Sequence, residues 1–287
     1  MNKTQEIIEK IEELCAKGKN NEFKKSIKNT VENAVSKGLP LNFISFTCST
    51  INSKYLFTKK PWLYVKTNPK GNNLTGDILK LQEIVLEFRK IYPNTQLNII
   101  IGNTDPYYIY LEQFKNFPKQ YDFLWKKFSR RWDEYEKIFG DWLDTVAPKI
   151  KAVVISWYQF EKKIENETGK SFKTEYGKVL GNILGYFDNS QLEWELRKLK
   201  TQFSTNKYFE GLDRPGNALL KEWTKRKFAE YTTQGKWIYE NIPNAILIQN
   251  EKPSNLRSQM YQPLIQKDCK VSLPIVYFLG IDNSGYQ

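Results

Sequence analysis

The spacing of apolar residues predicts two helices at the start of the chain and a strand directly after them. Over residues 1–38 the apolar positions recur every three or four residues, which is typical of amphipathic helices. Gly38 and Pro40 end this region, and residues 41–49 have strand character. The first strand is therefore expected only after a helical segment.

The same reading predicts four further strands, separated by helices. The strands are expected at apolar segments over residues 97–101, 152–157, 245–248 and 273–278. The helices are expected over residues 78–91, 121–143, 175–203 and 218–239. We expect Asp77 to cap the first of these helices. Because strands alternate with long helices, the predicted fold class is α/β: a Rossmann-like parallel sheet flanked by helices, with N-terminal helices and a helical insertion.

This pattern also predicts the domain organisation and the edge of the sheet that carries function. We expect residues 1–38 to form an N-terminal helical segment and residues 39–287 to form a single Rossmann-like catalytic domain. In such folds the ligand lies outside the carboxyl ends of the strands, where the strand order reverses. Three loops qualify by this rule, namely residues 49–52, residues 102–106 and the segment after Ile248.

The absence of histidine from all 287 residues narrows the chemistry. It excludes Ser-His-Asp and Cys-His nucleophiles, His-ligated zinc and proximal-His haem. Acid–base work must then use carboxylates, tyrosine, lysine or water. The three cysteines, Cys15, Cys48 and Cys269, lie far apart without CxxC spacing and indicate reduced thiols rather than a disulfide framework or a metal site. Neither a GxGxxG nor a GxxxxGK[ST] motif occurs, so we expect no metal and no cofactor.

The charge balance favours a polyanionic partner. Forty-four Lys+Arg against 32 Asp+Glu give a net charge of +12, which suits RNA, DNA, phosphorylated substrates or an anionic membrane surface. A lysine-rich surface without such a role explains the same charge equally well. The N-terminus lacks a signal-peptide apolar stretch, and no apolar run approaches the roughly 18 residues that span a bilayer. We expect a cytoplasmic protein without a membrane partner, and the oligomeric state stays open.

Ser49 and Asn52 follow the first predicted strand, at the edge where a reacting carbonyl could lie. A serine hydroxyl without histidine needs an acyl donor that is already activated, such as an aminoacyl ester. Asn52 could donate a hydrogen bond to the acyl oxygen. Serine and asparagine are also ordinary turn residues, so a purely structural role stays open.

Two further groups of residues are candidates for binding or catalysis. The helix predicted around residues 125–137 carries cations that can share one face and suit a phosphate backbone: Lys126, Lys127, Arg130, Arg131 and Lys137. A solvated surface helix is the alternative. Tyr231, before the fourth strand, could relay protons or orient an amine, and core packing is its alternative. Asp105, after the second strand, is a turn residue or a carboxylate that orients a ligand.

Four short segments between residues 40 and 240 resemble the tRNA-dependent cyclodipeptide synthases. They are residues 49–52, 139–143, 155–160 and 184–194. The resemblance implies a Rossmann-like fold similar to class I aminoacyl-tRNA synthetases. It also implies ping-pong chemistry in which Ser49 accepts an aminoacyl group from one tRNA, a second aminoacyl-tRNA extends it, and the dipeptide cyclises to a diketopiperazine.

The same resemblance implies roles for the remaining candidates. The cationic helix would hold the acceptor stem of aminoacyl-tRNA, Tyr231 would take the family's helical tyrosine position, and Trp157, within one matching segment, would contact the substrate. The chain departs from the family at Gly235, where a glutamate is expected four residues after the tyrosine. Glu230 and Glu240 could replace that glutamate, and the spacing does not choose between them. The loop from residue 53 to residue 77 is also longer than expected.

A second resemblance competes with the first. Residues 38–43, 89–93 and 242–247 look like landmarks of the isonitrile synthases, which convert an amino acid and ribulose 5-phosphate to an isonitrile. The arginine and histidine expected on the late strand of that family are absent, and Leu247 and Glu251 lie about where they should be. A non-catalytic RNA-binding protein is the third hypothesis.

Overall fold

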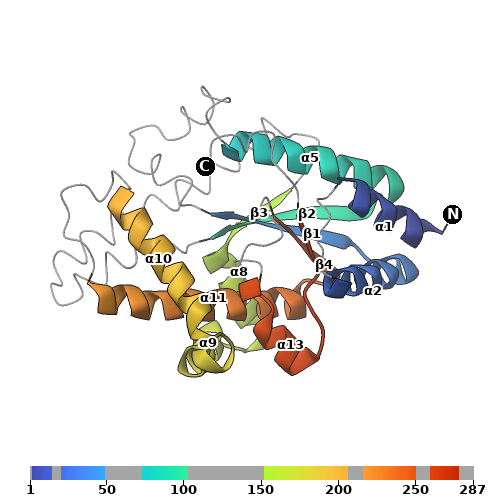
Figure 1. Cartoon of the computed structure of the whole chain (residues 1–287). Coiled ribbons are helices and arrows are strands. Elements are labelled where there is room, and N and C mark those ends of the chain that lie inside the picture. The colour runs from blue at the N-terminus through green and yellow to red at the C-terminus, as the bar shows by residue number, and fades with distance from the viewer. Residues whose placement is uncertain are drawn as a thin grey trace.

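The computed structural model describes residues 2–14, 21–48, 73–102, 152–205, 216–249 and 259–277. Within them lies a five-stranded, all-parallel sheet in the order β3-β2-β1-β4-β5 (Figure 1). The strands are β1 (Leu41–Cys48), β2 (Thr95–Gly102), β3 (Val153–Ser156), β4 (Ala245–Gln249) and β5 (Ile275–Tyr277). This arrangement confirms the predicted Rossmann-like α/β fold class.

The central strand β1 is the point where the strand order reverses. It pairs with β2 along its whole length, from Leu41 opposite Thr95 to Cys48 opposite Gly102. On its other side it pairs with β4, beginning at Asn42. Since ligands of open α/β sheets bind at the carboxyl ends of the strands on either side of this reversal, the segments after β1 and β4 are the favoured places for a site.

Helices cover both faces of the sheet (Figure 1). They are α1 (Lys3–Leu14), α2 (Asn21–Lys37), α5 (Asn73–Ile91), α8 (Trp157–Thr168), α9 (Phe172–Gly181), the 3-10 helix η2 (Ile183–Gly185), α10 (Asn189–Thr205), α11 (Asn217–Asn241) and α13 (Pro263–Cys269). Helices α1, α2 and α5 share one core with the sheet, and α8, α9, α10, α11 and α13 share the other. Each helix among the described residues is either too short or too polar to cross a lipid bilayer.

The two cores meet in the sheet because its central strands are buried on both faces. Phe43 of β1 faces the first core, where its ring lies 4.9 Å from that of Phe88 on α5. Ile44, the next residue, faces the second core. Ile7 and Ile11 of α1 also belong to the first core, so the N-terminal helices pack with the sheet rather than apart from it. Burial on both faces is typical of a parallel sheet.

Two predicted element boundaries differ from those of the structure in ways that bear on named residues. Helix α5 begins at Asn73, so Asp77 lies inside the helix and the predicted cap is wrong. Trp157 is the first residue of α8 rather than the end of a strand, because the Ser156 hydroxyl accepts the N–H of Gln159 (3.2 Å) and caps the helix.

The helix predicted over residues 175–203 is divided into α9, η2 and α10. Helix α10 begins at Asn189 because Asp188, the residue before it, caps the helix: Oδ1 of Asp188 accepts the N–H of Gln191 at 2.9 Å. Helices α8 and α13 were not predicted. The helix predicted over residues 121–143 lies outside the described residues.

Asn244 ties the amino edge of the sheet together. It has a φ of +50°, in the left-handed region that asparagine tolerates better than other non-glycine residues. Its Oδ1 accepts from Nδ2 of Asn33 on α2 (2.6 Å), and its Nδ2 donates to the carbonyl of Pro40 (3.1 Å). Its own carbonyl accepts the N–H of Asn42 on β1 (3.2 Å). One residue thus connects a helix and a loop through its side chain and a strand through its backbone.

The three segments that look like isonitrile synthase landmarks meet at this same edge. The Tyr92 hydroxyl donates to the carbonyl of Leu39 (2.7 Å), and Nδ2 of Asn42 donates to the carbonyl of Pro243, in the turn before β4 (2.8 Å). These contacts account for the residues by their role in the fold. They say nothing in favour of isonitrile chemistry.

We expect Asn244→Ala to lower the free energy of unfolding by about 2 kcal/mol, because it removes two side-chain hydrogen bonds and places a Cβ-bearing residue without a polar side chain at positive φ. Urea denaturation measures the loss. Asn244→Gly is the matched control, since it removes the same hydrogen bonds without strain and should lose less stability. Equal stability of wild type and Asn244→Ala would contradict this account.

Candidate functional site

Two of the residues predicted for the site, Trp157 and Tyr231, belong to the described part of the chain. Trp157 opens α8 directly after β3, at the carboxyl edge of the sheet. Tyr231 lies in the middle of α11. The other predicted site residues lie outside the described residues: Ser49, Asn52, Asp105, Lys126, Lys127, Arg130, Arg131 and Lys137.

An aromatic chain, formed by Trp157, Phe46, Tyr261 and Tyr231, brings the two described residues together. The Phe46 ring, near the carboxyl end of β1, lies 6.2 Å from the Trp157 ring and stacks at 5.5 Å on the Tyr261 ring. Tyr261 in turn meets Tyr231 edge to face at 5.1 Å. The structure therefore places the predicted tryptophan and tyrosine in one cluster beneath the end of the central strand.

This aromatic chain is buried. Trp157 is 2% exposed and Tyr231 is 4% exposed, whereas Phe46 keeps part of its surface accessible. The Trp157 ring also packs on Phe160 and Phe172, both at 5.3 Å. Trp157 and Tyr231 thus form a rigid support for the carboxyl edge.

A buried ion pair fixes the surroundings of Tyr231. Nζ of Lys227 on α11 donates to Oε1 of Glu195 on α10, and both residues are almost fully buried. The same ammonium group lies 6.0 Å from the centroid of the Tyr231 ring and 5.6 Å from that of Trp223. Removing either partner would leave an unpaired charge inside the protein, so the pair holds α10 and α11 in register.

Glu230, the residue before Tyr231, has the most perturbed carboxyl group of this cluster. Burial, and after it the Glu161 carboxylate on α8, raises its pKa from 4.5 to about 8, and Lys227 opposes the shift. The residue retains some exposed surface, but protein atoms surround its carboxyl group. Its Oε1 accepts from Nε2 of Gln234 (3.2 Å). A carboxyl group with this pKa can give or take a proton near neutral pH.

Glu161 links Glu230 to the tryptophan. Burial is the largest cause of its raised pKa, the Glu165 charge adds to the shift, and Lys162 together with the Trp157 indole opposes it. Among the described residues the buried indole N–H reaches no acceptor within ordinary hydrogen-bond geometry, so its effect on Glu161 is a weak one. The Glu161 charge on α8 therefore acts on Glu230 of α11, and each of the two lies within four residues of a predicted residue in the chain.

The structure distinguishes the two glutamates that the sequence left open. Glu240 lies at the far end of α11, where it pairs with Lys170 (2.9 Å) and Lys236 (3.8 Å) near the amino edge of the sheet. Glu230 lies in the middle of the helix, beside Lys227 and Tyr231. Of the two, Glu230 shares the surroundings of the predicted tyrosine.

Gly235 explains why no glutamate stands at the position where the resemblance expects one. A Cβ at this position would lie 2.1 Å from the carbonyl oxygen of Tyr261, a backbone atom that cannot rotate away. A side chain of any kind is therefore excluded unless the segment before α13 moves. The departure from the family pattern follows from the close contact between α11 and Tyr261.

The sequence singled out Trp157 and Tyr231 as candidates but not Glu161, Glu195 or Lys227. In a chain with 44 Lys+Arg and 32 Asp+Glu nothing in their spacing marks these three residues, because charged residues are common on every helix. The lack of histidine was the one signal that directed attention to carboxyl groups as candidates for acid–base chemistry. Among the described residues no three Cys, Asp or Glu side chains come together in a way that could hold a metal ion.

A comparison with models of known protein families finds no family that matches the chain, and a comparison with curated proteins finds no matching sequence.

We expect Gly235→Ala to lower the free energy of unfolding by about 1–3 kcal/mol, the usual cost of overpacking, because the new methyl group collides with the Tyr261 carbonyl. Gly177→Ala is the matched control: Gly177 is an exposed glycine inside α9 with open space around it, so alanine should be neutral or slightly stabilising there. Thermal and urea unfolding measure both variants. A Gly235→Ala protein as stable as wild type would show that the contact is not tight.

The raised pKa of Glu230 predicts a pH-dependent stability. The folded protein keeps this proton up to about pH 8, whereas the unfolded chain releases it near pH 4.5, so raising the pH across this interval favours unfolding. Glu230→Gln should remove a penalty on the order of 4 kcal/mol at pH 8 and little at pH 4.5. Urea unfolding at several pH values measures the difference, with Glu222→Gln on the same helix as the control. Parallel curves for wild type and Glu230→Gln would contradict it.

Proposed function

We propose that this protein joins two aminoacyl groups delivered on tRNA and releases them as a cyclic dipeptide. The observation that carries the proposal is Glu230, whose carboxyl group has a pKa of about 8 and lies beside Tyr231 on α11. A chain without histidine needs some other group that exchanges protons near neutral pH. Glu230 supplies one, close to the residue that the family resemblance identifies as catalytic.

In the first step Ser49 accepts an aminoacyl group. Its Oγ attacks the ester carbonyl of the aminoacyl-tRNA, the bond to the ribose oxygen breaks, and the ribose hydroxyl leaves with the proton of the serine. The product is a seryl ester. Because the donor ester is already activated, the attack needs no imidazole. In this proposal Asn52 donates a hydrogen bond to the acyl oxygen.

In the second step the amino group of the seryl ester attacks the ester carbonyl of a second aminoacyl-tRNA. The bond to the ribose oxygen breaks, the tRNA leaves with a proton on its ribose hydroxyl, and a dipeptidyl ester stays on Ser49. The free amino group of the dipeptide then attacks the seryl ester, closes the six-membered ring and returns the proton to Ser49. Each attack requires a proton to leave nitrogen. An α-amino group has a pKa of about 7.7–8.0, close to that of Glu230, so proton transfer between them costs little.

In the proposed reaction each residue of the site has a role. Glu230 is the acid–base group, Tyr231 orients the attacking amine, and Trp157 with Phe46 forms the apolar wall beside the acyl group. Ser49 is the residue that follows the last residue of β1, next to the reversal in strand order. The five cations from Lys126 to Lys137 would hold the acceptor stem through contacts that are independent of base sequence.

Expression of the chain should yield diketopiperazines that mass spectrometry of culture extracts detects above an empty-vector control. Ser49→Ala should abolish the product because no seryl ester forms, and Ser53→Ala, a serine in the same segment, should retain it. RNase treatment of the purified reaction should also stop it. Product from Ser49→Ala equal to that of wild type would contradict the proposal.

The rival hypotheses give different results in the same assays. Turnover of ribulose 5-phosphate that RNase does not affect would favour an isonitrile synthase. Salt-dependent RNA binding without product would favour an RNA-binding protein. Within the main proposal, Glu230→Gln should lower the rate by roughly a hundredfold or more and remove the pH dependence near 8, while Glu222→Gln leaves both unchanged.

A further inference from the structure

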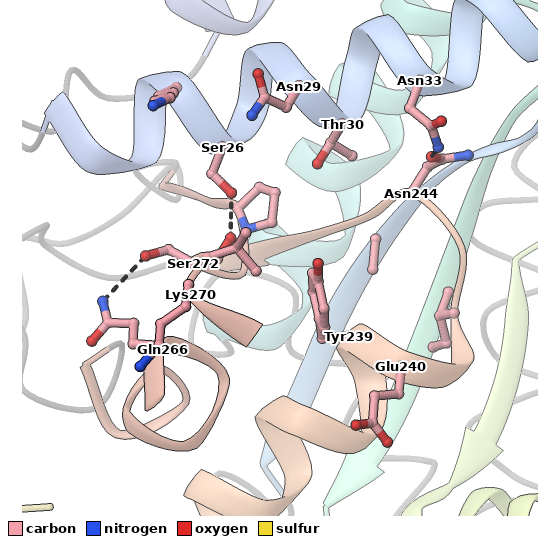
Figure 2. Close-up of a pocket in the computed structure, with 15 residues that line it drawn as sticks. Ser26, Asn29, Thr30, Asn33, Tyr239, Glu240, Asn244, Gln266, Lys270 and Ser272 are labelled. Carbon is pink, nitrogen blue, oxygen red and sulfur yellow. Dashed lines mark hydrogen bonds between the residues drawn. The ribbon is translucent and has the colours of Figure 1, made fainter. Parts of the chain in front are cut away.

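A polar cavity of about 1090 Å³ opens at the amino edge of the sheet, the edge opposite to the aromatic chain. Its walls come from α2, the last turn of α11, the start of β4 and the turn between α13 and β5 (Figure 2). This volume is at the upper end of the range for small-molecule sites, roughly 300–1,000 Å³. No part of the proposed reaction uses the cavity, so its lining calls for a separate explanation.

Helix α2 turns a polar stripe toward the cavity. Ser26, Asn29, Thr30 and Asn33 recur at helical spacing and line it. Figure 2 shows Ser26, Thr30 and Asn33 on the side of α2 that faces the other walls. The buried apolar face of the helix is a different one, formed by Ile27, Val31 and Ala34. The neutral amides and hydroxyls of the stripe can each donate and accept hydrogen bonds, which matches a ligand rich in hydroxyl groups.

Several groups around the cavity have unused hydrogen-bonding capacity. Within the described part of the chain the side chains of Asn29, Thr30, Tyr239 and Lys270 form no hydrogen bond and no ion pair, although all four line the cavity. Glu240, the carboxylate of the lining, is neutralised by Lys170 and Lys236. The cavity therefore offers donors and positive charge rather than negative charge.

Two lysines, Lys25 and Lys270, line the cavity, and both are exposed. The Ser26 hydroxyl donates to the carbonyl of Ser272, and this bond joins the first turns of α2 to the segment that carries Lys270. Figure 2 places Tyr239 between Ser272 and Asn244. The lining thus combines two cations, a neutral polar wall and Tyr239, which is 37% exposed.

We propose that this cavity binds a nucleoside monophosphate. Lys25 and Lys270 hold the phosphate, Asn29 and Thr30 of α2 hydrogen-bond the ribose hydroxyls, and the base stacks on Tyr239. Each part of the ligand matches one part of the lining: two cations for a dianion, neutral amides and hydroxyls for the sugar, and an aromatic face for the planar base.

Isothermal titration of the full chain with AMP tests the assignment. We expect saturable binding, at least tenfold weaker binding of adenosine because it lacks the phosphate, and at least tenfold weaker binding of ribose 5-phosphate because it lacks the base. Tyr239→Ala should weaken AMP binding about tenfold without affecting ribose 5-phosphate. Lys270→Asn keeps a residue that tolerates the φ of +58° at this position and should weaken AMP binding at least fivefold.

Lys28→Gln is the matched control, since Lys28 lies on the same helix, pairs with Glu32 and does not line the cavity. It should bind AMP as wild type does. Absence of AMP binding, equal binding of AMP and adenosine, or equal loss in Lys28→Gln and Lys270→Asn would each overturn the proposal. Because titration measures binding alone, the outcome is independent of whether a cyclic dipeptide is formed.

Discussion

The close contact of α11 with the backbone of Tyr261 is the constraint on which the second core depends. With a hydrogen atom at position 235, the helix can lie directly against this carbonyl, and the Thr232 hydroxyl then reaches the carbonyl of Met260 at 2.8 Å. The Tyr261 ring is held between Tyr231 and Phe46 as a result. Gln262 continues the link, since its side chain exchanges two hydrogen bonds with the backbone of Leu273 before β5 (3.0 and 2.9 Å).

The same helix carries two kinds of buried charge with opposite consequences. Lys227 and Glu195 neutralise each other, so their burial adds rigidity to the packing of α10 on α11. Burial and the charge of Glu161 both act against ionisation of Glu230, and the positive charge of Lys227 compensates them only in part. The position of Glu230 in the fold is unfavourable for the ionised form. Such an arrangement is costly in a purely structural protein and useful in an enzyme.

The fold was predictable because its strands carry their own signal. Strand β1 is buried on both faces, and its apolar residues, interrupted only by Asn42, Ser45 and Thr47, begin directly after Gly38 and Pro40. Helix boundaries were less predictable, since the start of α8 depends on the hydroxyl of Ser156 rather than on any change in hydropathy. The site was the least predictable part. Glu161 and Glu230 are far apart in the chain, on α8 and α11, and only the fold brings the Glu161 charge close enough to act on Glu230.

The enclosed carboxyl group of Glu230 also has a consequence for measurement. In most proteins imidazole groups take up and release protons between pH 6 and 8 and hide any single carboxyl group. Here that background is missing, because the chain has no histidine. A carboxyl group with a pKa of about 8 is then among the few that change charge in this interval. Potentiometric proton counting, or the carbonyl absorption of a protonated acid in the infrared, can follow it in the unmodified protein without any label.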